Sequence, residues 1–210
     1  MLATVLVVIA TFCVLVLSEW LSRAKQIHAE LTRKFVHVTV GTFVAFWPFF
    51  LTWRQIQILS LAFFVIVCLS IKFDIFRSIH AVKRNMTGEL LFAIVIGLLA
   101  SISPNNWVFT AAMLHLSISD GIAAIAGVLW GDNNSYKVFG RTKSLVGSAA
   151  FLLSSLIILA AYHAVSGSTT SVATILWLPL VATATENLAV QGTDNLVMPM
   201  IIALVLASGV

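Results

Sequence analysis

The sequence predicts an all-α polytopic integral membrane protein, one transmembrane domain over residues 1–210 with about eight membrane-spanning helices (seven to eight). Three observations carry this prediction. Hydrophobic residues make up 60% of the chain and charged residues only 10%, whereas soluble domains carry about 25% charged residues. The apolar runs approach the length of about 20 residues that a helix needs to cross the hydrocarbon layer. The basic residues fall in alternate loops, as the positive-inside rule predicts.

The first apolar run is interpreted as a membrane span rather than a signal peptide. No basic residue precedes it, and Glu19 and Trp20 stand where a cleavage site would have small residues. The second and third runs are separated by little more than Arg54, and the fourth run is short. In chain order, the predicted spans are residues 2–18, 36–53, 55–71, 89–103, 107–130, 147–165, 171–186 and 194–210.

The charged residues predict the orientation of these spans. Eleven of the twelve lysine and arginine residues lie in the loops after the first, third and fifth spans, and Arg54 is the exception. The positive-inside rule places these loops in the cytoplasm and both chain termini on the other side of a cell membrane or endomembrane. Seven of the eight acidic residues lie in or beside cytoplasmic loops. We therefore expect the polar chemistry at the cytoplasmic face.

The net charge, the distribution of basic residues and the cysteines indicate which classes of ligand to expect. A net charge of +4 is typical of a protein at an anionic membrane surface, and it weakly favours an anionic ligand. No basic run with interleaved aromatic residues indicates nucleic acid binding. Cys13 and Cys68 lie in apolar runs and have no metal-ligand spacing.

Asp120 is the acidic residue that lies well inside a predicted span. A lone charge there costs about 2.5–3.5 kcal/mol on insertion scales, so intramembrane acids usually mark functional sites. No basic residue lies within four positions of Asp120, and we expect its counter-ion to arrive with a nucleotide rather than from the chain. Small residues around it, such as Ala123 and Gly127, leave room for a neighbouring helix or a ligand. The alternative is a protonated or hydrogen-bonded structural aspartate.

A second acidic group lies at the last predicted loop. Glu186 ends the seventh span, and Asp194 and Asn195 begin the eighth. With Asp120 they place three carboxylates at similar depth, and such oxygen ligands suit Mg²⁺ together with phosphate oxygens. A plainer interpretation is that Asp194 caps the last helix, which is compatible with metal binding.

Two basic groups are candidates for binding an anion. In the fifth loop, Gly140 predicts a turn, Arg141 and Lys143 supply charge, and Ser144 is a predicted N-cap of the sixth span, with Gly147 in its first turn. The spacing is not that of a P-loop. The second group combines Arg33, Lys34 and His37 on one helical face with Lys83 and Arg84 before the fourth span. The alternative is that these basic residues are topology anchors and that His37 is a core histidine.

The order of these motifs resembles one family. RKFVH (33–37), SDGIAAIAG (119–127), GRTKSLVGSAA (140–150), Glu186 and DNLVMP (194–199) are similar to the CTP-dependent lipid-alcohol kinases. These are the dolichol or polyprenol kinases, phytol kinases and CTP-type diacylglycerol kinases, distantly similar to phosphatidate cytidylyltransferases. The resemblance implies a helical membrane fold and Mg²⁺-dependent transfer of the CTP γ-phosphate to a lipid hydroxyl.

The resemblance also implies roles for individual residues. The chain departs from the family pattern at Gly121, where a polar residue is common, and at Leu145 and Val146, where an acidic residue is common. The predicted catalytic residues are Asp120, Lys143, His37 and Asp194. The predicted metal ligands are Asp120, Glu186 and Asp194. The predicted nucleotide-binding residues are Arg33, Lys34, Lys83, Arg84, Arg141, Lys143, Ser144, Gly147 and Asn195.

The predicted partners are therefore CTP, a hydrophobic lipid alcohol and membrane lipids, with no nucleic acid; homo-oligomerisation stays open. A polyprenol or dolichol-like alcohol is favoured, with phytol and diacylglycerol as alternatives. The preference for CTP over ATP rests on the resemblance alone. Three other functions compete: a cytidylyltransferase that makes a CDP-lipid, a small proton-coupled transporter that uses Asp120, and a non-catalytic membrane scaffold. The signature of the cytidylyltransferases is absent from the sequence, which favours the kinase.

Overall fold

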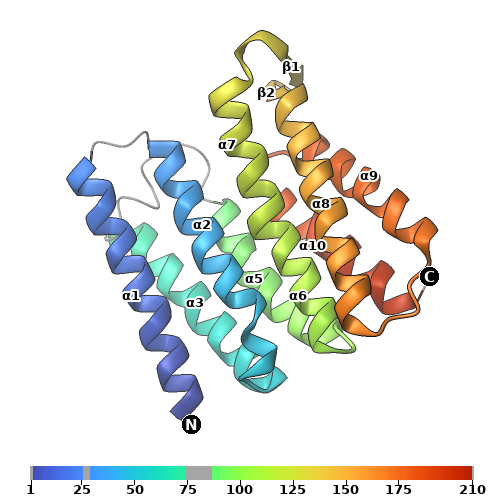
Figure 1. Cartoon of the computed structure of the whole chain (residues 1–210). Helices are drawn as coiled ribbons and strands as arrows, with labels where there is room; N and C mark the ends of the chain where they lie inside the picture. Colours follow the sequence, from blue (N-terminus) through green and yellow to red (C-terminus); the bar gives the residue numbers. More distant parts are fainter. Residues whose placement is uncertain (1, 26–28, 74–86, 210) are drawn as a thin grey trace.

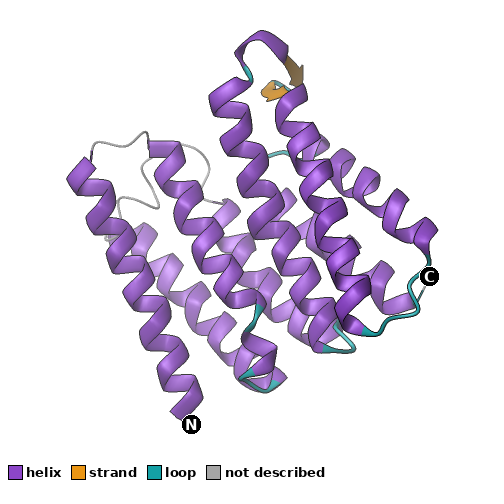
Figure 2. Cartoon of the chain, viewed as in Figure 1, coloured by secondary structure: helices purple, strands orange, loops and turns teal. Residues whose placement is uncertain are grey.

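The computed structural model describes residues 2–25, 29–73 and 87–209, which fold into a bundle of helices with one small hairpin (Figures 1 and 2). The elements are α1 (Leu2–Lys25), α2 (Ala29–Ala45), η1 (Trp47–Phe49), α3 (Trp53–Phe73), α5 (Thr87–Ile102), α6 (Asn106–Leu114), η2 (His115–Ser119), α7 (Asp120–Trp130), η3 (Asp132–Asn134), β1 (Ser135–Val138), β2 (Arg141–Ser144), α8 (Leu145–Ser166), α9 (Val172–Leu188) and α10 (Asp194–Ser208).

The apolar runs coincide with helices of different lengths. Among the residues that the structure describes, three helices are long and apolar enough to cross a membrane, namely Trp53–Phe73, Asn106–Trp130 and Leu145–Ser166. Shorter apolar helices cover Thr4–Val14, Thr87–Ile102, Val172–Leu188 and Asp194–Ser208. These helices are consistent with the predicted membrane protein, and the count of about eight spans stays a prediction.

The second predicted span, 36–53, differs from the helix that forms there. Helix α2 begins earlier, at Ala29, and ends at Ala45. Pro48 lies in the short helical turn η1 that follows, and a proline disfavours α-helical backbone in the residue before it. The early start places Lys34, which precedes the predicted span, inside the same helix as His37.

One continuous helix, α6–η2–α7, runs through the bundle and changes its hydrogen-bonding pattern halfway. Asn105 caps its start by accepting a hydrogen bond from the Val108 N–H at 3.0 Å. The segment η2 is a π-turn, and Asp120 directly follows it. The first part of this helix carries apolar side chains that are fully buried, including those of Phe109 and Met113. The same continuous helix therefore supplies both the core and the start of the polar site.

A β-hairpin adds two short strands to the predicted all-α fold. It lies beyond the ends of α7 and α8 (Figure 1). The strands pair antiparallel, with Val138 opposite Arg141. The two turn residues, Phe139 and Gly140, both have positive φ, 47° and 77°, as a two-residue hairpin turn requires. The turn predicted at Gly140 is confirmed, and the hairpin around it is new.

Candidate active site

A cavity of about 440 Å³ lies where the starts of α2, α5, α8 and α10 meet the end of α9, the helix α7 and the hairpin. Every predicted site residue whose side chain is described lines this cavity. They are Lys34, His37, Asp120, Arg141, Lys143, Ser144, Gly147, Glu186, Asp194 and Asn195. Lys83 and Arg84 lie outside the described residues, and so does the side chain of Arg33. The structure therefore brings together groups that lie up to about 160 positions apart in the chain.

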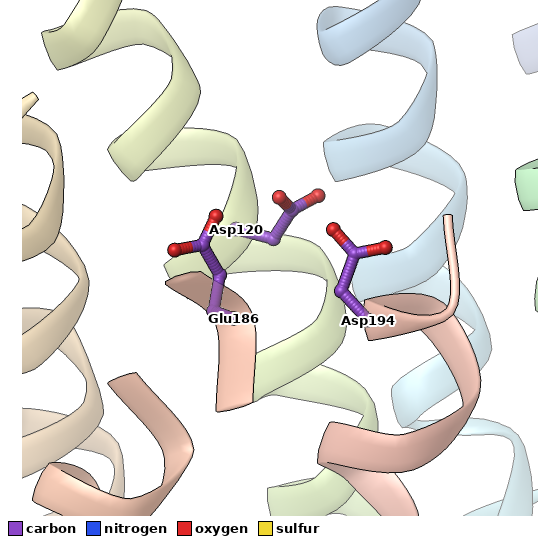
Figure 3. Close-up of side chains that lie close together, drawn as sticks. All are labelled: Asp120, Glu186 and Asp194. Atoms are coloured by element: carbon purple, nitrogen blue, oxygen red, sulfur yellow. The ribbon is translucent and has the colours of Figure 1, made fainter. Parts of the chain in front are cut away.

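Three carboxylates from three helical segments share one space in this cavity. Asp120 begins α7, Glu186 lies in the last turn of α9, and Asp194 begins α10. One oxygen from each lies within 4.8 Å of the other two, and Figure 3 shows the three groups side by side. Divalent cations such as Mg²⁺ and Ca²⁺ bind carboxylate oxygens at about 2.0–2.6 Å, so small side-chain adjustments would bring all three onto one ion.

Asp120 has a counter-ion within the chain, so the expectation that it would lack one is wrong. The Lys34 ammonium donates a hydrogen bond to Asp120 Oδ2 at 2.5 Å. The two side chains are only 10% and 7% exposed. Because α2 begins at Ala29, Lys34 is held inside the helix and reaches the site from across the bundle. The pair neutralises a carboxylate whose burial as an isolated ion would be very unfavourable.

Glu186 is paired with a lysine in the same way. Lys143 lies on strand β2 and donates to the Glu186 carboxylate, and also to the Glu186 backbone carbonyl at 3.1 Å. Side chains two apart on a strand point to the same side, so Arg141 and Lys143 both face the cavity. The hairpin is therefore the element that delivers the basic residues predicted from the fifth loop.

The start of α8 opens onto the same cavity. Ser144 caps this helix as predicted, because its hydroxyl accepts a hydrogen bond from the Gly147 N–H at 3.0 Å. A Cβ at Gly147 would lie 3.0 Å from the Ala123 carbonyl oxygen, so α7 and α8 pack with their backbones close. The helix start offers N–H groups and a positive dipole end to an anion beside Arg141 and Lys143.

Asp194 does not cap α10, so that interpretation is wrong. Thr193 occupies the cap position without a side-chain cap, and Asp194 is the first helical residue. Its Oδ1 accepts a hydrogen bond from the Asn195 N–H at 3.2 Å, and the Asn195 amide donates to the Gly88 carbonyl at 2.8 Å. Asn195 thereby ties α10 to the start of α5, in addition to lining the cavity.

His37 contacts the turn that precedes Asp120. Its Nε2 lies 3.0 Å from the Leu116 carbonyl and 3.5 Å from Asp120 Oδ2. Its ring lies 4.9 Å from the Phe92 ring, measured between centroids. A carbonyl oxygen only accepts hydrogen bonds, so Nε2 carries the hydrogen in this contact.

Sequence reasoning missed a polar network that fixes the hairpin to the bundle. Asn187 Oδ1 accepts hydrogen bonds from Tyr136 and Ser148, both at 2.9 Å, and these two hydroxyls lie 2.7 Å apart. Asn187 and Ser148 each directly follow a predicted site residue. Their polarity was a usable signal, whereas the register that brings Tyr136 to them was not visible without the hairpin.

The chemistry of the cavity defines a class of protein. Clustered carboxylates attract a divalent cation, while Lys, Arg and a helix start attract phosphate oxygens. A cavity that offers both kinds of group is suited to bind phosphate oxygens together with a divalent cation, which is the site chemistry of enzymes that act on phosphate groups.

Comparison with known proteins specifies the family. The chain is 32% identical to a phytol kinase of Synechocystis sp. over 203 residues, an alignment that covers 93% of this chain and 86% of the relative. The chain therefore belongs to the phytol kinase family, and it is a kinase of a lipid alcohol. No family model matches the chain. No solved structure matches it. The predicted resemblance is confirmed at the level of lipid-alcohol kinases.

Proposed function

We propose that the protein transfers the γ-phosphate of CTP to the hydroxyl of an isoprenoid alcohol, in a Mg²⁺-dependent reaction at the cytoplasmic membrane face. The observation that carries the proposal is the cluster of Asp120, Glu186 and Asp194 within 4.8 Å, flanked by Lys34 and Lys143. The phytol kinase relative moves phytol ahead of the polyprenols as the first alcohol to test. CTP as the donor rests on the family resemblance.

The three carboxylates would hold the metal ion. Their oxygens are the hard ligands that Mg²⁺ prefers, and their spacing lets one ion contact all three. When bound there, Mg²⁺ would supply charge neutralisation to the phosphate oxygens. Asp120 and Asp194 belong to different helices, so the ion would also fix the relative position of α7 and α10.

The basic side of the cavity would bind the phosphates of the nucleotide. The alcohol oxygen forms a new bond to the γ-phosphorus while the bond between this phosphorus and the β-γ bridging oxygen breaks, so CDP leaves. Arg141, Lys143 and the start of α8 would neutralise the charge that develops on the departing diphosphate. A carboxylate of the cluster would accept the proton of the alcohol.

The two lysines would change partners as the substrate binds. Lys34 and Lys143 balance buried carboxylates in the structure described here. With Asp120 and Glu186 engaged in holding a cation, the ammonium groups of Lys34 and Lys143 would be available to donate hydrogen bonds to phosphate oxygens. The site would thus keep its charges paired both before and after the metal nucleotide enters.

A panel of alcohols and nucleotides tests the proposal. Full-length protein in detergent is incubated with phytol, a polyprenol or diacylglycerol, each with CTP or ATP, with and without Mg²⁺. We expect formation of phytyl or polyprenyl phosphate that requires CTP and Mg²⁺. Folded protein that phosphorylates none of the alcohols would contradict the proposed function. Preference for ATP would contradict the nucleotide assignment.

A further inference from the structure

In the π-turn η2, the backbone carbonyl of Leu116 forms a hydrogen bond with a side chain of another helix, that of His37. In a regular α-helix the Asp120 N–H would pair with the Leu116 carbonyl. Here that N–H bonds the carbonyls of His115 and Ser117 instead. The Leu116 carbonyl accepts a hydrogen bond from His37 Nε2 at 3.0 Å. The hydrogen bond from His37 therefore replaces the bond from the Asp120 N–H that the Leu116 carbonyl would accept in a regular α-helix.

The extra residue in this turn sets the direction of Asp120. An α-helix turns by about 100° per residue, so a π-turn rotates everything after it relative to everything before it. Before the turn, Phe109 and Met113 are fully buried in the apolar core. After the turn, Asp120 and Gly127 line the cavity. A regular helix with one residue fewer would keep the core contacts and swing Asp120 out of the cavity.

Helix α2 is seated too closely on this turn for His37 to move freely. A Cβ added to Gly41 would lie 2.5 Å from Ser117 Cβ, and one added to Gly121 would lie 2.1 Å from Val38 Cγ2. On α2, Val38 directly follows His37 and Gly41 lies one turn further along, so both close approaches are next to the His37 contact. The Phe92 ring, 4.9 Å from the His37 ring, packs on it from α5.

We propose that His37 is a positioning residue. It holds the π-turn through the Leu116 carbonyl and so keeps the Asp120 carboxylate directed toward Glu186 and Asp194, with which it forms the proposed metal cluster. The proposal rests on the proposed function for the role of that cluster. It replaces the predicted catalytic role of His37, because Nε2 already carries a hydrogen that it donates to a carbonyl.

Two substitutions separate positioning from proton transfer. His37→Gln keeps an N–H donor near the Nε2 position but has no group that titrates near neutral pH. His37→Leu keeps bulk and loses the donor. Removing a residue that orients a metal ligand typically lowers metal affinity or activity by about 10–100-fold. We expect that loss in His37→Leu, together with a higher Mg²⁺ requirement, and activity within about threefold of wild type in His37→Gln.

Metal binding is measured separately from turnover. Mn²⁺ binding to full-length protein in detergent, followed by electron paramagnetic resonance, should weaken in His37→Leu and recover in His37→Gln. Thr42→Val is the matched control, because Thr42 also contacts the π-turn, with its hydroxyl 3.5 Å from the Ser117 hydroxyl. We expect this variant to match wild type in both measurements.

The outcomes distinguish this proposal from the proposed function. Folded His37→Gln that binds Mn²⁺ normally but has lost turnover would overturn the positioning role and indicate that His37 acts directly on the substrate. Normal Mn²⁺ binding in His37→Leu would overturn it as well. If His37→Leu does not fold, the His37→Gln result alone decides. Wild-type protein that binds Mn²⁺ but phosphorylates no alcohol would refute the proposed function and leave the positioning test intact.

Discussion

The two ends of the bundle carry opposite chemistry. The cavity end holds the paired charges of Lys34, Asp120, Lys143, Glu186 and the neighbouring Asp194. The aromatic end lies at the far ends of α2 and α6, away from the hairpin (Figure 1). Its ring pairs are Phe43 with Trp47, Phe46 with Phe49, Phe49 with Trp107, and Trp53 with Phe109.

The difference separates a region of aromatic packing from the region that carries the polar chemistry. Large rings bury much apolar area, and Trp47 and Phe109 belong to the buried core. At the cavity end, small residues such as Gly121 and Gly147 let the backbones approach, which brings charged side chains from separate helices into contact. Substitutions at the cavity end should therefore change turnover, whereas those at the aromatic end should change stability.

The largest effect is expected at Asp120. Asp120→Asn keeps the size of the side chain but removes the charge that would bind the metal, so turnover should fall by at least about a hundredfold. Ser119→Ala is the control, since the Ser119 hydroxyl is buried without a hydrogen-bond partner among the described residues. Initial rates of lipid phosphorylation, normalised to folded protein, measure the difference.

Asp120→Asn also leaves Lys34 as a buried charge without its carboxylate, which is strongly destabilising in itself. The double variant Lys34→Met with Asp120→Asn removes both charges. It should recover thermal stability in detergent but not turnover. Recovery of turnover in the double variant would show that Asp120 acts only through Lys34.

A similar but smaller loss is expected on the hairpin. Lys143→Gln removes an ammonium from the Glu186 carboxylate and from the proposed phosphate site, so turnover should fall by about a hundredfold. Lys137→Gln is the matched control, because Lys137 is exposed on the neighbouring strand, opposite Thr142. Equal losses in both variants would indicate a general effect of hairpin charge rather than a site at Lys143.

Gly121 tests the close packing at the cavity end. Gly121→Ala places a methyl group where the structure has only 2.1 Å to Val38 Cγ2, and overpacking of this kind costs about 1–3 kcal/mol. We expect lower thermal stability and weaker Mn²⁺ binding. Val38→Ala should restore both in the double variant, because it removes the methyl group that clashes. Absence of rescue would mean that the defect arises elsewhere.

The smallest effect on turnover is expected at the aromatic end. Phe109 is fully buried, and its ring centroid lies 5.9 Å from that of Trp53. Phe109→Leu removes this aromatic pair, which contributes about 0.5–1.5 kcal/mol beyond the area it buries. Thermal unfolding in detergent should shift to lower temperature, while turnover per folded molecule stays at the wild-type rate. A selective loss of turnover would contradict the separation of the two ends.

The sequence predicted the features that depend on local composition. Apolar runs mark helices, the Ser144 cap follows from a hydroxyl at a helix start, and the turn follows from Gly140. The grouping of Asp120 with Glu186 and Asp194 could be anticipated because span counting places all three at one end of the bundle.

The remaining features depend on register between distant segments. Lys34 and Asp120 are 86 positions apart, so their pairing requires knowing how α2 rotates against α7. The strands are four residues each, too short to stand out beside the apolar helices. The π-turn at HLSIS (115–119) has the same apolar and small polar residues as a regular α-helix, so the composition of this segment gives no sign of the extra residue in the turn. At Gly121, a Cβ would lie only 2.1 Å from Val38 Cγ2, and this close approach of α2 was not visible from the sequence.

The position of the transferred phosphorus tests the central claim most directly. Wild-type protein and Asp120→Asn are each incubated with phytol, Mg²⁺ and CTP labelled at either the α- or the γ-phosphate. We predict that wild-type protein moves only the γ label into the lipid and releases CDP, and that Asp120→Asn moves neither label. Appearance of the α label in the lipid, or transfer at the wild-type rate by Asp120→Asn, would contradict a CTP-dependent kinase site built around Asp120.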